Sequence, residues 1–312
     1  MKRVLLLVAL LLVAAVAALA WSFAPARLAV GTAPALAVPP AHPPDGMRLS
    51  SVPAGRIVVK AALAYRGGAF GETRDFTMTA VLVQHPRGTL LFDTGFGSDV
   101  DAQVQGFPWL MRFLTRYEKG TPVAEQLRAH AVGPGDLAGI VLTHAHWDHV
   151  SGIPDLPGVP VWVNRVERDF IRNGGYASAL VRSFGDLPYH VYDFTGGPYL
   201  GFDRSEDVFG DGSIVLVPAP GHTPGSIIAF LTLPSGMRYA LVGDLVWQRE
   251  GIELPAERPW LSRSLADADP AGVRRWIVLI HQIASAMPDL LIVPAHDARV
   301  FERLPRFPKW AG

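Results

Sequence analysis

The sequence predicts a layered α/β domain in which β-sheets pack together and helices lie outside them. Short runs rich in Val, Ile, Leu and aromatic residues, bounded by Gly, Pro or Asp, recur through residues 56–312 and are typical of strands. Strands come first in each half of this region, with helices between and after them. The region holds about 257 residues, a usual size for one domain. We therefore expect a single domain, preceded by N-terminal segments of a different character.

The chain begins with an apolar segment. After Met1, Lys2 and Arg3, the eighteen residues from Val4 to Trp21 contain no charged side chain, no Gly and no Pro. A helix of this length can cross a hydrocarbon core, and Ala18-Leu19-Ala20 also offers a small-x-small cleavage site. Residues 1–21 are therefore predicted to be a targeting helix, either a signal peptide or a membrane anchor. Because positive charge favours the cytoplasmic face, the rest of the chain is expected to be exported. It would be periplasmic or extracellular, soluble after cleavage or anchored.

Residues 22–55 are predicted to be an extended Ala/Pro-rich linker. Seven prolines lie between positions 25 and 53, mixed with Ala and with little charge. This composition favours an extended chain over a helix. The folded domain is therefore expected to begin near Arg56 and to span residues 56–312.

Nine strands and two helices are expected in this domain. The strands are Ile57–Tyr65, Phe76–Gln84, Thr89–Phe92, Gly139–Leu142, Val161–Asn164, Ser213–Val217, Ser226–Leu233, Arg238–Val242 and Leu290–Val293. One helix starts at Pro108 and carries Leu110, Phe113, Leu114 and Tyr117 at helical spacing. The other has Asp269 as N-cap and Pro270 at its first position, and runs to about Met287.

Composition excludes several classes of function. The chain has no cysteine, and its 28 Lys and Arg residues balance 28 Asp and Glu residues. Without cysteine there are no disulfides, thiolate nucleophiles, cysteine zinc ligands or cysteine-bound iron–sulfur clusters. A neutral chain without a long basic run predicts no nucleic-acid partner. A small molecule is therefore the expected partner, and the oligomeric state stays open.

Metal-capable side chains concentrate between residues 144 and 149. His144, His146, Asp148 and His149 place four of them within six residues. On an extended strand end, His144 and His146 project to the same side because side chains alternate. If the chain then turns into a short helix, Asp148 and His149 point at a neighbouring position in space. The cluster therefore predicts ligands for two adjacent metals.

Two metal sites need more ligands than this cluster supplies. His222 in Pro-Gly-His-Thr-Pro-Gly, Asp244 after Leu-Val-Gly and His296 after Val-Pro-Ala each follow an apolar, strand-like run. A rigid scaffold would present such residues to one site lined by loops. We predict that all three join the cluster.

Together these motifs resemble the metallo-β-lactamase fold superfamily of hydrolases. The match spans roughly residues 56–305 and includes, in order, the Asp93-Thr94-Gly95 turn, the cluster at 144–149, His222, Asp244 and His296. The resemblance implies an αββα sandwich with metals at one edge of its two sheets. Asp93 would then be a structural residue or support a ligand, unless it only forms the turn.

The resemblance also implies a set of ligands for two divalent metal ions. His144, His146 and His222 would hold one metal, Asp148, His149 and His296 the second, and Asp244 would bridge both. Imidazole and carboxylate ligands without thiolates suit Zn²⁺ first, and they also accept Mn, Fe or Co.

Within the superfamily, the sequence resembles most closely the N-acyl homoserine lactonase-like branch. The resemblance rests on the stretch 146–152, on Val161 to Glu167 and on Gly221 to Gly225. Di-iron oxygen reductases of this fold usually carry a glutamate at the position of His146, which disfavours a redox role. Lactonases of this branch often have a tyrosine three residues after the bridging aspartate, where this chain has Trp247. An indole has one donor and no titratable hydroxyl, so the substrate or its activation can differ.

The function implied is a metal-dependent hydrolase that opens lactone or ester bonds by attack of a metal-bridging hydroxide. Asp148 and Asp244 would be the catalytic residues, with Asp148 passing a proton to the leaving alkoxide. Two alternatives stay open: a phosphotriester, sulfate-ester or thioester hydrolase on the same site, and an inactive membrane-anchored metal-binding module. Trp247 and Trp109 are expected to wall a substrate groove, unless they pack in the core or beside a membrane.

Overall fold

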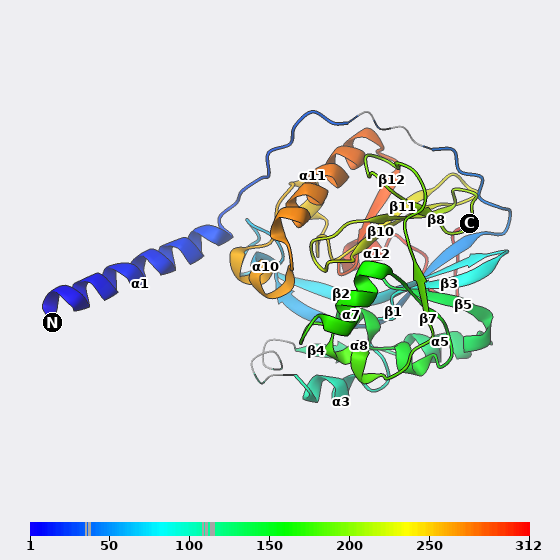
Figure 1. The fold of residues 1–312 in the computed structure, drawn as a ribbon, viewed down its shortest axis with the longest axis horizontal. Coiled ribbons are helices and arrows are strands. Elements are labelled where there is room, and N and C mark those ends of the chain that lie inside the picture. Colours follow the sequence, from blue (N-terminus) through cyan, green and yellow to red (C-terminus); the bar gives the residue numbers. More distant parts are fainter. Residues whose placement is uncertain (35, 37–38, 108, 110–111, 113–115) are drawn as a thin grey trace.

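Two mixed β-sheets face each other at the centre of the protein (Figure 1). The computed structural model describes residues 1–312 except 35, 37–38, 108, 110–111 and 113–115. The larger sheet has the order β4-β1-β2-β3-β5-β6-β7, and the smaller sheet has the order β12-β11-β10-β9-β8. In the smaller sheet β11 pairs antiparallel with β10 and parallel with β12.

The strands of the larger sheet are β1 (Arg48–Lys60), β2 (Thr73–His85), β3 (Gly88–Phe92), β4 (Tyr117–Lys119), β5 (Leu137–Val141), β6 (Val161–Asn164) and β7 (Tyr189–Tyr192). Those of the smaller sheet are β8 (Glu206–Asp207), β9 (Ile214–Pro218), β10 (Ile227–Thr232), β11 (Arg238–Gly243) and β12 (Leu290–Pro294). The described helices are α1 (Lys2–Phe23), α2 (Ala61–Ala64), α3 (Val100–Gln105), α5 (Val123–Arg128), α6 (Trp147–Val150), α7 (Arg165–Asn173), α8 (Ala179–Ser183), α9 (Glu250–Glu253), α10 (Trp260–Ala266), α11 (Pro270–Ala286) and α12 (Ala298–Phe301).

Strand alternation builds three apolar layers. In β2, Val81 and Val83 point into the layer between the sheets, while Met78, Ala80 and Leu82 point into the layer on the outer face. In β10, Ile228 and Phe230 turn away from the central layer and meet α11. Because successive side chains of a strand alternate between faces, each sheet buries both of its faces. The result is the arrangement of packed sheets with outer helices that the strand and helix pattern predicted.

Helix α11 forms where its capping residues predict it. The side chain of Asp269 accepts a hydrogen bond from the backbone N–H of Ala271, and Pro270 occupies the first helical position. Its buried residues, which include Val273, Ile277 and Ile280, recur every three to four positions and pack on the smaller sheet. The predicted helix is thus confirmed, and it ends one residue before Met287.

The first strand starts earlier than predicted. Residues 48–55, assigned to the linker from their composition, form the first half of β1, and Leu49 and Val52 are fully buried there. Pro53 is tolerated because the pairing register with β2 shifts between Pro53 and Arg56. The predicted strand end at Tyr65 is also wrong, since the strand gives way at Ala61 to the short helix α2.

The rest of the linker lies on the domain surface. The backbone N–H of Leu28 donates to the carbonyl of Pro255 at 2.8 Å, and that of His42 donates to the carbonyl of Asp211 at 2.7 Å. The side chain of Leu36 packs against the apolar layer beneath α11. Residues 22–23, which were also assigned to the linker, end helix α1, because the apolar helical run continues to Phe23. The described residues from Ala24 to Met47 form no helix or strand, as predicted, but they follow the domain instead of hanging free.

The helix predicted from Pro108 falls largely on residues outside the described part of the chain. Tyr117, its last predicted member, instead begins β4 and pairs with Ile57 of β1. Three short strands, β4, β7 and β8, had no recognisable run of apolar residues in the sequence.

Replacing the N-cap of α11 tests the source of its stability. Asp269→Ala removes the acceptor for Ala271 N–H and is expected to lower the free energy of unfolding by about 1 kcal/mol. Urea denaturation measures this loss. Asp289→Ala, at an exposed aspartate beyond the other end of the helix, is the matched control. Equal stability of the two variants would contradict the capping role.

Candidate metal centre

The structure brings all seven predicted ligand residues together at one edge of the two sheets. They reach this edge from the ends of four strands and from α6: His144 and His146 after β5, Asp148 and His149 in α6, His222 after β9, Asp244 after β11 and His296 after β12. Their burial ranges from half-buried for His146 and Asp148 to nearly complete for the others. Strand ends hold these side chains because the sheets beneath them are packed on both faces.

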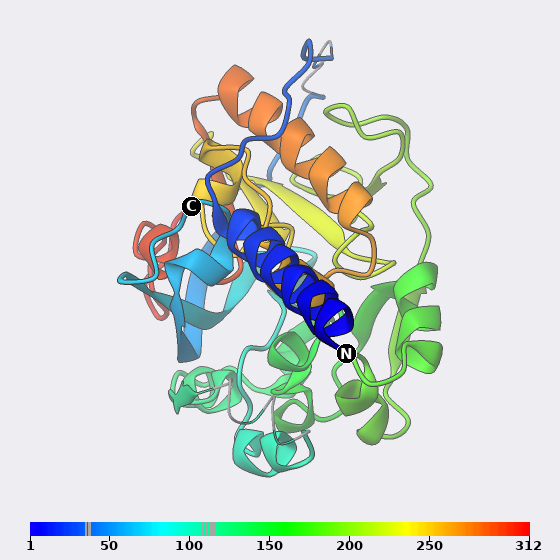
Figure 2. The ribbon, with the colours of Figure 1, turned by 90° about the vertical axis from the view of Figure 1, so that its left-hand side faces the viewer.

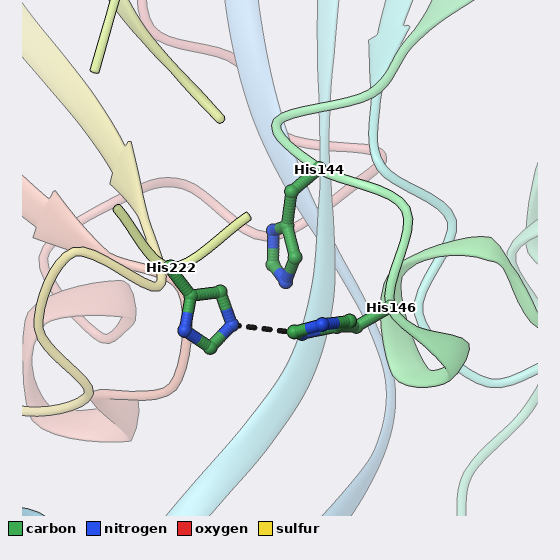
Figure 3. Close-up of side chains that lie close together, drawn as sticks. All are labelled: His144, His146 and His222. Atoms are coloured by element: carbon green, nitrogen blue, oxygen red, sulfur yellow. Dashed lines mark hydrogen bonds between the residues drawn. The ribbon is translucent and has the colours of Figure 1, made fainter. Parts of the chain in front are cut away.

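The ligand atoms form three overlapping groups. Within each group the atoms lie within 4.8 Å of one another, and the groups are His144, His146 and His222; His144, His149 and Asp244; and Asp148, His149 and His296. Figure 3 shows the first group, with the three rings pointing at one position from two separate loops. The first and third groups are the two ligand sets that the family resemblance implied.

Asp244 lies between these two sets. Its Oδ2 atom is 3.4 Å from Nε2 of His222, and its Oδ1 atom is 3.0 Å from Nε2 of His296. Each carboxylate oxygen thus faces a different set. This is the position that a bridging carboxylate requires.

Partners around the site fix which ring nitrogen of each histidine faces inward. Nδ1 of His149 lies 2.8 Å from Asp93, Nδ1 of His222 lies 3.0 Å from Asp267, and Nδ1 of His296 lies 3.1 Å from the carbonyl of Thr77. These partners accept hydrogen bonds, so each Nδ1 carries the proton and each Nε2 presents its lone pair to the site. Such acceptors behind the imidazoles are typical of metal-binding histidines.

His146 is oriented the other way. Its Nδ1 faces Nε2 of His222 at 2.8 Å, so these two nitrogens point toward the same position (Figure 3). His144 again presents Nε2, because its Nδ1 lies 3.1 Å from the hydroxyl of Thr143, which itself donates to Asp93.

Three polar atoms in the described residues support a metal at this position. Nε2 of His144, Nε2 of His149 and Oδ1 of Asp244 are buried without a hydrogen-bond partner. Burying such atoms unpaired costs free energy, and all three belong to the predicted ligands. Two imidazole-rich sets joined by a carboxylate are a donor set that suits divalent zinc. The residues present therefore fit the metals that the resemblance implied.

The electrostatics of the site also favour cations. Burial lowers the pKa of His144 and His146 well below the ordinary value, which keeps both rings neutral and able to bind a metal. Burial opposes protonation of His149 and His296 as well, but the carboxylates facing them outweigh it and raise both pKa values. The pKa of Asp244 is lowered despite its burial, because His296 and His149 face it. Positive charge therefore stabilises these carboxylates, and either protons or divalent ions can provide it.

Asp93 supports the ligands from behind. Besides its contact with His149, its two oxygens accept hydrogen bonds from the backbone N–H and the hydroxyl of Thr143, both at 2.7 Å. Its φ of 55° places it in the left-handed region, which aspartate tolerates better than most residues. The side chain therefore joins the loop of His144 to the helix of His149, a structural and supporting role of the kind expected for it.

Sequence reasoning assigned no role to Glu167, which joins two of the ligand loops. Its carboxylate is 1% exposed and accepts hydrogen bonds from the N–H of Ala145, the hydroxyl of Thr223 and the N–H of Gly225. Burial raises the pKa of Glu167 to about 7, although these hydrogen bonds act in the opposite direction. Its position three residues after the strand-ending Asn164 was part of the family resemblance, but no local signal indicated the contact.

The sequence also does not indicate the roles of Asp267 and Arg258. Asp267 accepts from His222, and the guanidinium of Arg258 lies 3.4 Å from the same carboxylate oxygen. Arg258 is 2% exposed and also donates to the backbone carbonyls of Leu245 and Asp244. The buried Arg–Asp pair therefore connects His222 to the chain around Asp244. Neither residue lies in a recognisable motif.

The two tryptophans predicted to bind substrate lie in different settings. The indole N–H of Trp247 donates to Oδ2 of Asp244 at 2.8 Å, and the Arg258 guanidinium lies over its ring at 4.5 Å. Its single donor is thus engaged by a predicted ligand. Trp109 is 72% exposed, with neighbours outside the described residues, so its role stays a prediction.

Comparison with known proteins agrees with this geometry. Residues 74–296 match the family model of the metallo-beta-lactamase superfamily. The chain belongs to this superfamily. The resemblance stated from the sequence is thereby confirmed, and the chain is a metallo-β-lactamase superfamily hydrolase with lactonase-like homologues.

Two curated relatives of this metallo-β-lactamase superfamily member cover most of its length. The probable metallo-hydrolase Rv2300c of Mycobacterium tuberculosis is 32% identical over 242 residues, which cover 71% of this chain and 75% of the relative. The N-acyl homoserine lactonase AttM of Agrobacterium fabrum is 24% identical over 249 residues, which cover 77% of this chain and 89% of the relative.

Solved structures share the fold of the superfamily member described here. An N-acyl homoserine lactone hydrolase with the product N-hexanoyl-L-homoserine at its catalytic metal centre has a TM-score of 0.67 and 19% identity, and the match covers 85% of this chain and 98% of that one. The dizinc quorum-quenching lactonase AidC has a TM-score of 0.57 and 15% identity, with 91% and 92% of the two chains covered.

Removing the carboxylate behind His222 tests the supporting contacts. Asp267→Ala leaves Nδ1 of His222 without its acceptor, and we expect metal affinity to fall by about 10- to 100-fold. Competition with a chelator and metal content per chain measure this change, with circular dichroism to establish that the variant folds. Asp203→Ala, at an exposed aspartate, is the control. Equal metal affinity in both variants would show that Asp267 does not support the site.

Proposed function

We propose that this chain is a dinuclear metal-dependent hydrolase that opens lactone or ester bonds. The observation that carries this proposal is the pair of candidate ligand sets on either side of Asp244, whose histidines are buried or half-buried with inward-facing nitrogens. Zn²⁺ is the expected ion, and the nitrogen and oxygen donors also accept Mn, Fe or Co.

The substrate class is supported by the relatives. AttM is a lactonase of N-acyl homoserine, and two of the solved structures with this fold carry a lactone-hydrolysis product. In lactone hydrolysis, one water adds across the ring C–O bond and gives a carboxylic acid and an alcohol. The site needs to supply a nucleophilic oxygen, a group that polarises the carbonyl and a proton for the leaving oxygen.

The residues divide these tasks. Bound divalent metals would activate a water and polarise the carbonyl oxygen. His144, His146 and His222 would hold one ion, and Asp148, His149 and His296 would hold the other. Asp244 would bind both ions. Asp148 is only half-buried, with Oδ2 3.3 Å from His296, so it is the ligand carboxylate best placed to exchange a proton with substrate. Asp244 is held by Trp247 and is shielded from solvent.

Export of the domain is part of this proposal. Helix α1 is long and apolar enough to cross a membrane by length and composition, and its apolar part is not buried against the domain. Lys2 and Arg3 at its start favour a cytoplasmic N-terminus. The hydrolase domain would then lie on the outer side, as a soluble or an anchored protein.

Metal removal tests the function directly. Chelation of the full chain is expected to abolish hydrolysis of lactones and aryl esters, and addition of Zn²⁺ or Mn²⁺ should restore it, because the nucleophile depends on bound metal. His146→Ala should lower kcat/KM by at least about a hundredfold, whereas His190→Ala, at an exposed histidine distant in sequence from the motifs, should leave it unchanged. Phosphotriesters and thioesters in the same panel examine the alternative substrates. Activity that survives complete metal removal would refute the proposal.

Trp247 is expected to position Asp244 and not to select the acyl chain. Trp247→Phe keeps an aromatic ring but removes the N–H donated to Asp244, so kcat/KM should fall by about tenfold. Because the substitution keeps an aromatic ring and removes only the N–H donated to Asp244, this loss should be equal for substrates with short and long chains. Kinetics with a series of acyl lengths measures it. A loss confined to long chains would instead support the predicted role of Trp247 in binding substrate.

A further inference from the structure

Exposed apolar side chains gather where α1 meets the domain. The group comprises Trp21, Phe70, Trp260, Leu261 and Leu265, whose exposed fractions lie between 44% and 68%. Trp21 belongs to the end of α1, Phe70 to the turn before β2, and the other three to α10. We call these five residues the apolar face.

Direct contacts hold the elements of the apolar face together. Helix α1 contacts α10, and the ring of Phe23 lies 5.0 Å from that of Phe70. The hydroxyl of Ser262 in α10 donates to the carbonyl of Leu63 in α2 at 2.7 Å. Figures 1 and 2 show α1 projecting away from the domain, with only its C-terminal end beside α10.

The end of α1 is fixed to the domain and not joined by a loose tether. The guanidinium of Arg66 donates to the carbonyls of Trp21 and Ala24 at 3.1 and 3.2 Å and lies over the Trp21 ring at 4.6 Å. Arg66 is itself buried beside Glu257. The N–H of Gly67 donates to the carbonyl of Phe23 at 3.0 Å. Because these contacts fix the helix end, the medium that surrounds α1 also contacts α10.

We propose that the apolar face lies against the lipid bilayer that holds α1. A helix of 22 residues is about 33 Å long, enough to span a hydrocarbon core, and its exposed apolar side chains need such surroundings. Trp21 and Trp260 lie at the outer end of this helix, and tryptophan concentrates at the membrane–water interface. Leu261 and Leu265 are exposed apolar residues of α10, the helix that contacts α1. The helix also continues for three residues beyond Ala20 and is tied to the domain there, as an uncleaved anchor would be.

In this orientation the membrane contacts a helix whose flanking residues reach the predicted ligands. Helix α10 lies in the chain between Arg258 and Asp267, the buried pair that supports His222. One segment therefore provides both the membrane contact and the buried pair that supports His222. Resting on the proposed function, this arrangement indicates amphiphilic substrates, namely lactones or esters with acyl chains long enough to dissolve in the bilayer.

Site-directed labelling tests the orientation without reference to activity. The chain has no cysteine, so single cysteines can be introduced without background labelling. Leu265→Cys and Phe70→Cys in the full chain would carry a spin label in vesicles of phosphatidylcholine with phosphatidylglycerol. Met237→Cys, 46% exposed in the turn between β10 and β11, is the control. We expect the labels at 265 and 70 to be accessible to oxygen and protected from a water-soluble nickel reagent, and the label at 237 to show the reverse.

Two results would overturn the proposal. One is equal access of the nickel reagent to positions 265 and 237. The other is a disulfide between two copies of the Leu265→Cys chain in vesicles, because a second copy would then cover the face in place of lipid.

Kinetics tests the consequence for substrate. Leu265→Glu should reduce turnover of a long-chain lactone dissolved in vesicles by about tenfold, since a leucine side chain that enters lipid contributes strongly to membrane contact. Turnover of a short-chain, water-soluble lactone should stay within about twofold, and Met237→Glu should change neither. Equal losses on both substrates would contradict the inference about substrate. If the wild-type chain hydrolyses no ester or lactone, the proposed function fails, while the labelling result still decides the orientation.

Discussion

The structure depends on the cost of collecting five imidazoles and two carboxylates in a space that excludes water. Unpaired polar atoms and charges are expensive in such a space, so each ligand needs a partner that fixes its orientation and balances its charge. Asp93, Asp267 and the carbonyl of Thr77 provide these partners for three of the histidines. Three ligand atoms still lack a partner among the described residues, which is consistent with a site completed by cations.

The two packed sheets explain how the predicted ligands are held in position. The ligands follow strands whose two faces are buried, so their positions are fixed by packing and not by the loops themselves. Glu167 then ties the loop of His144 and His146 to the loop of His222, although these loops belong to different sheets. A buried carboxylate with three donors is rigid because moving any donor leaves the carboxylate unsatisfied. The loops that carry the predicted ligands are therefore held together by a contact in which no predicted ligand side chain takes part.

The sequence predicts those features of the fold and the site that short residue patterns encode. The seven ligands were recognisable because the cluster at 144–149 is compact and the other three follow apolar runs, and α11 was predictable from Asp269 and Pro270. Arg258, Asp267 and Glu167 were not predictable, since their partners lie far along the chain and their surroundings carry no motif. The start of β1 was misjudged because Pro53 and the neighbouring alanines suggested a linker. Pairing with β2 and the register shift at Pro53 override that composition.

The segment from Asp244 to Asp267 has two roles: it contacts the predicted ligands, and it forms the surface beside the end of α1. Its inward-facing side chains are Trp247, Arg258 and Asp267, which contact Asp244 and His222. Its exposed side is α10, beside the end of α1. Because α10 lies between two residues that contact the ligand shell, a shift of this helix must be absorbed by Arg258 and Asp267 or transmitted to His222. Trp247, at the position where related lactonases often have tyrosine, contacts the same group of residues, since its indole N–H donates to Asp244 and its ring packs on Arg258.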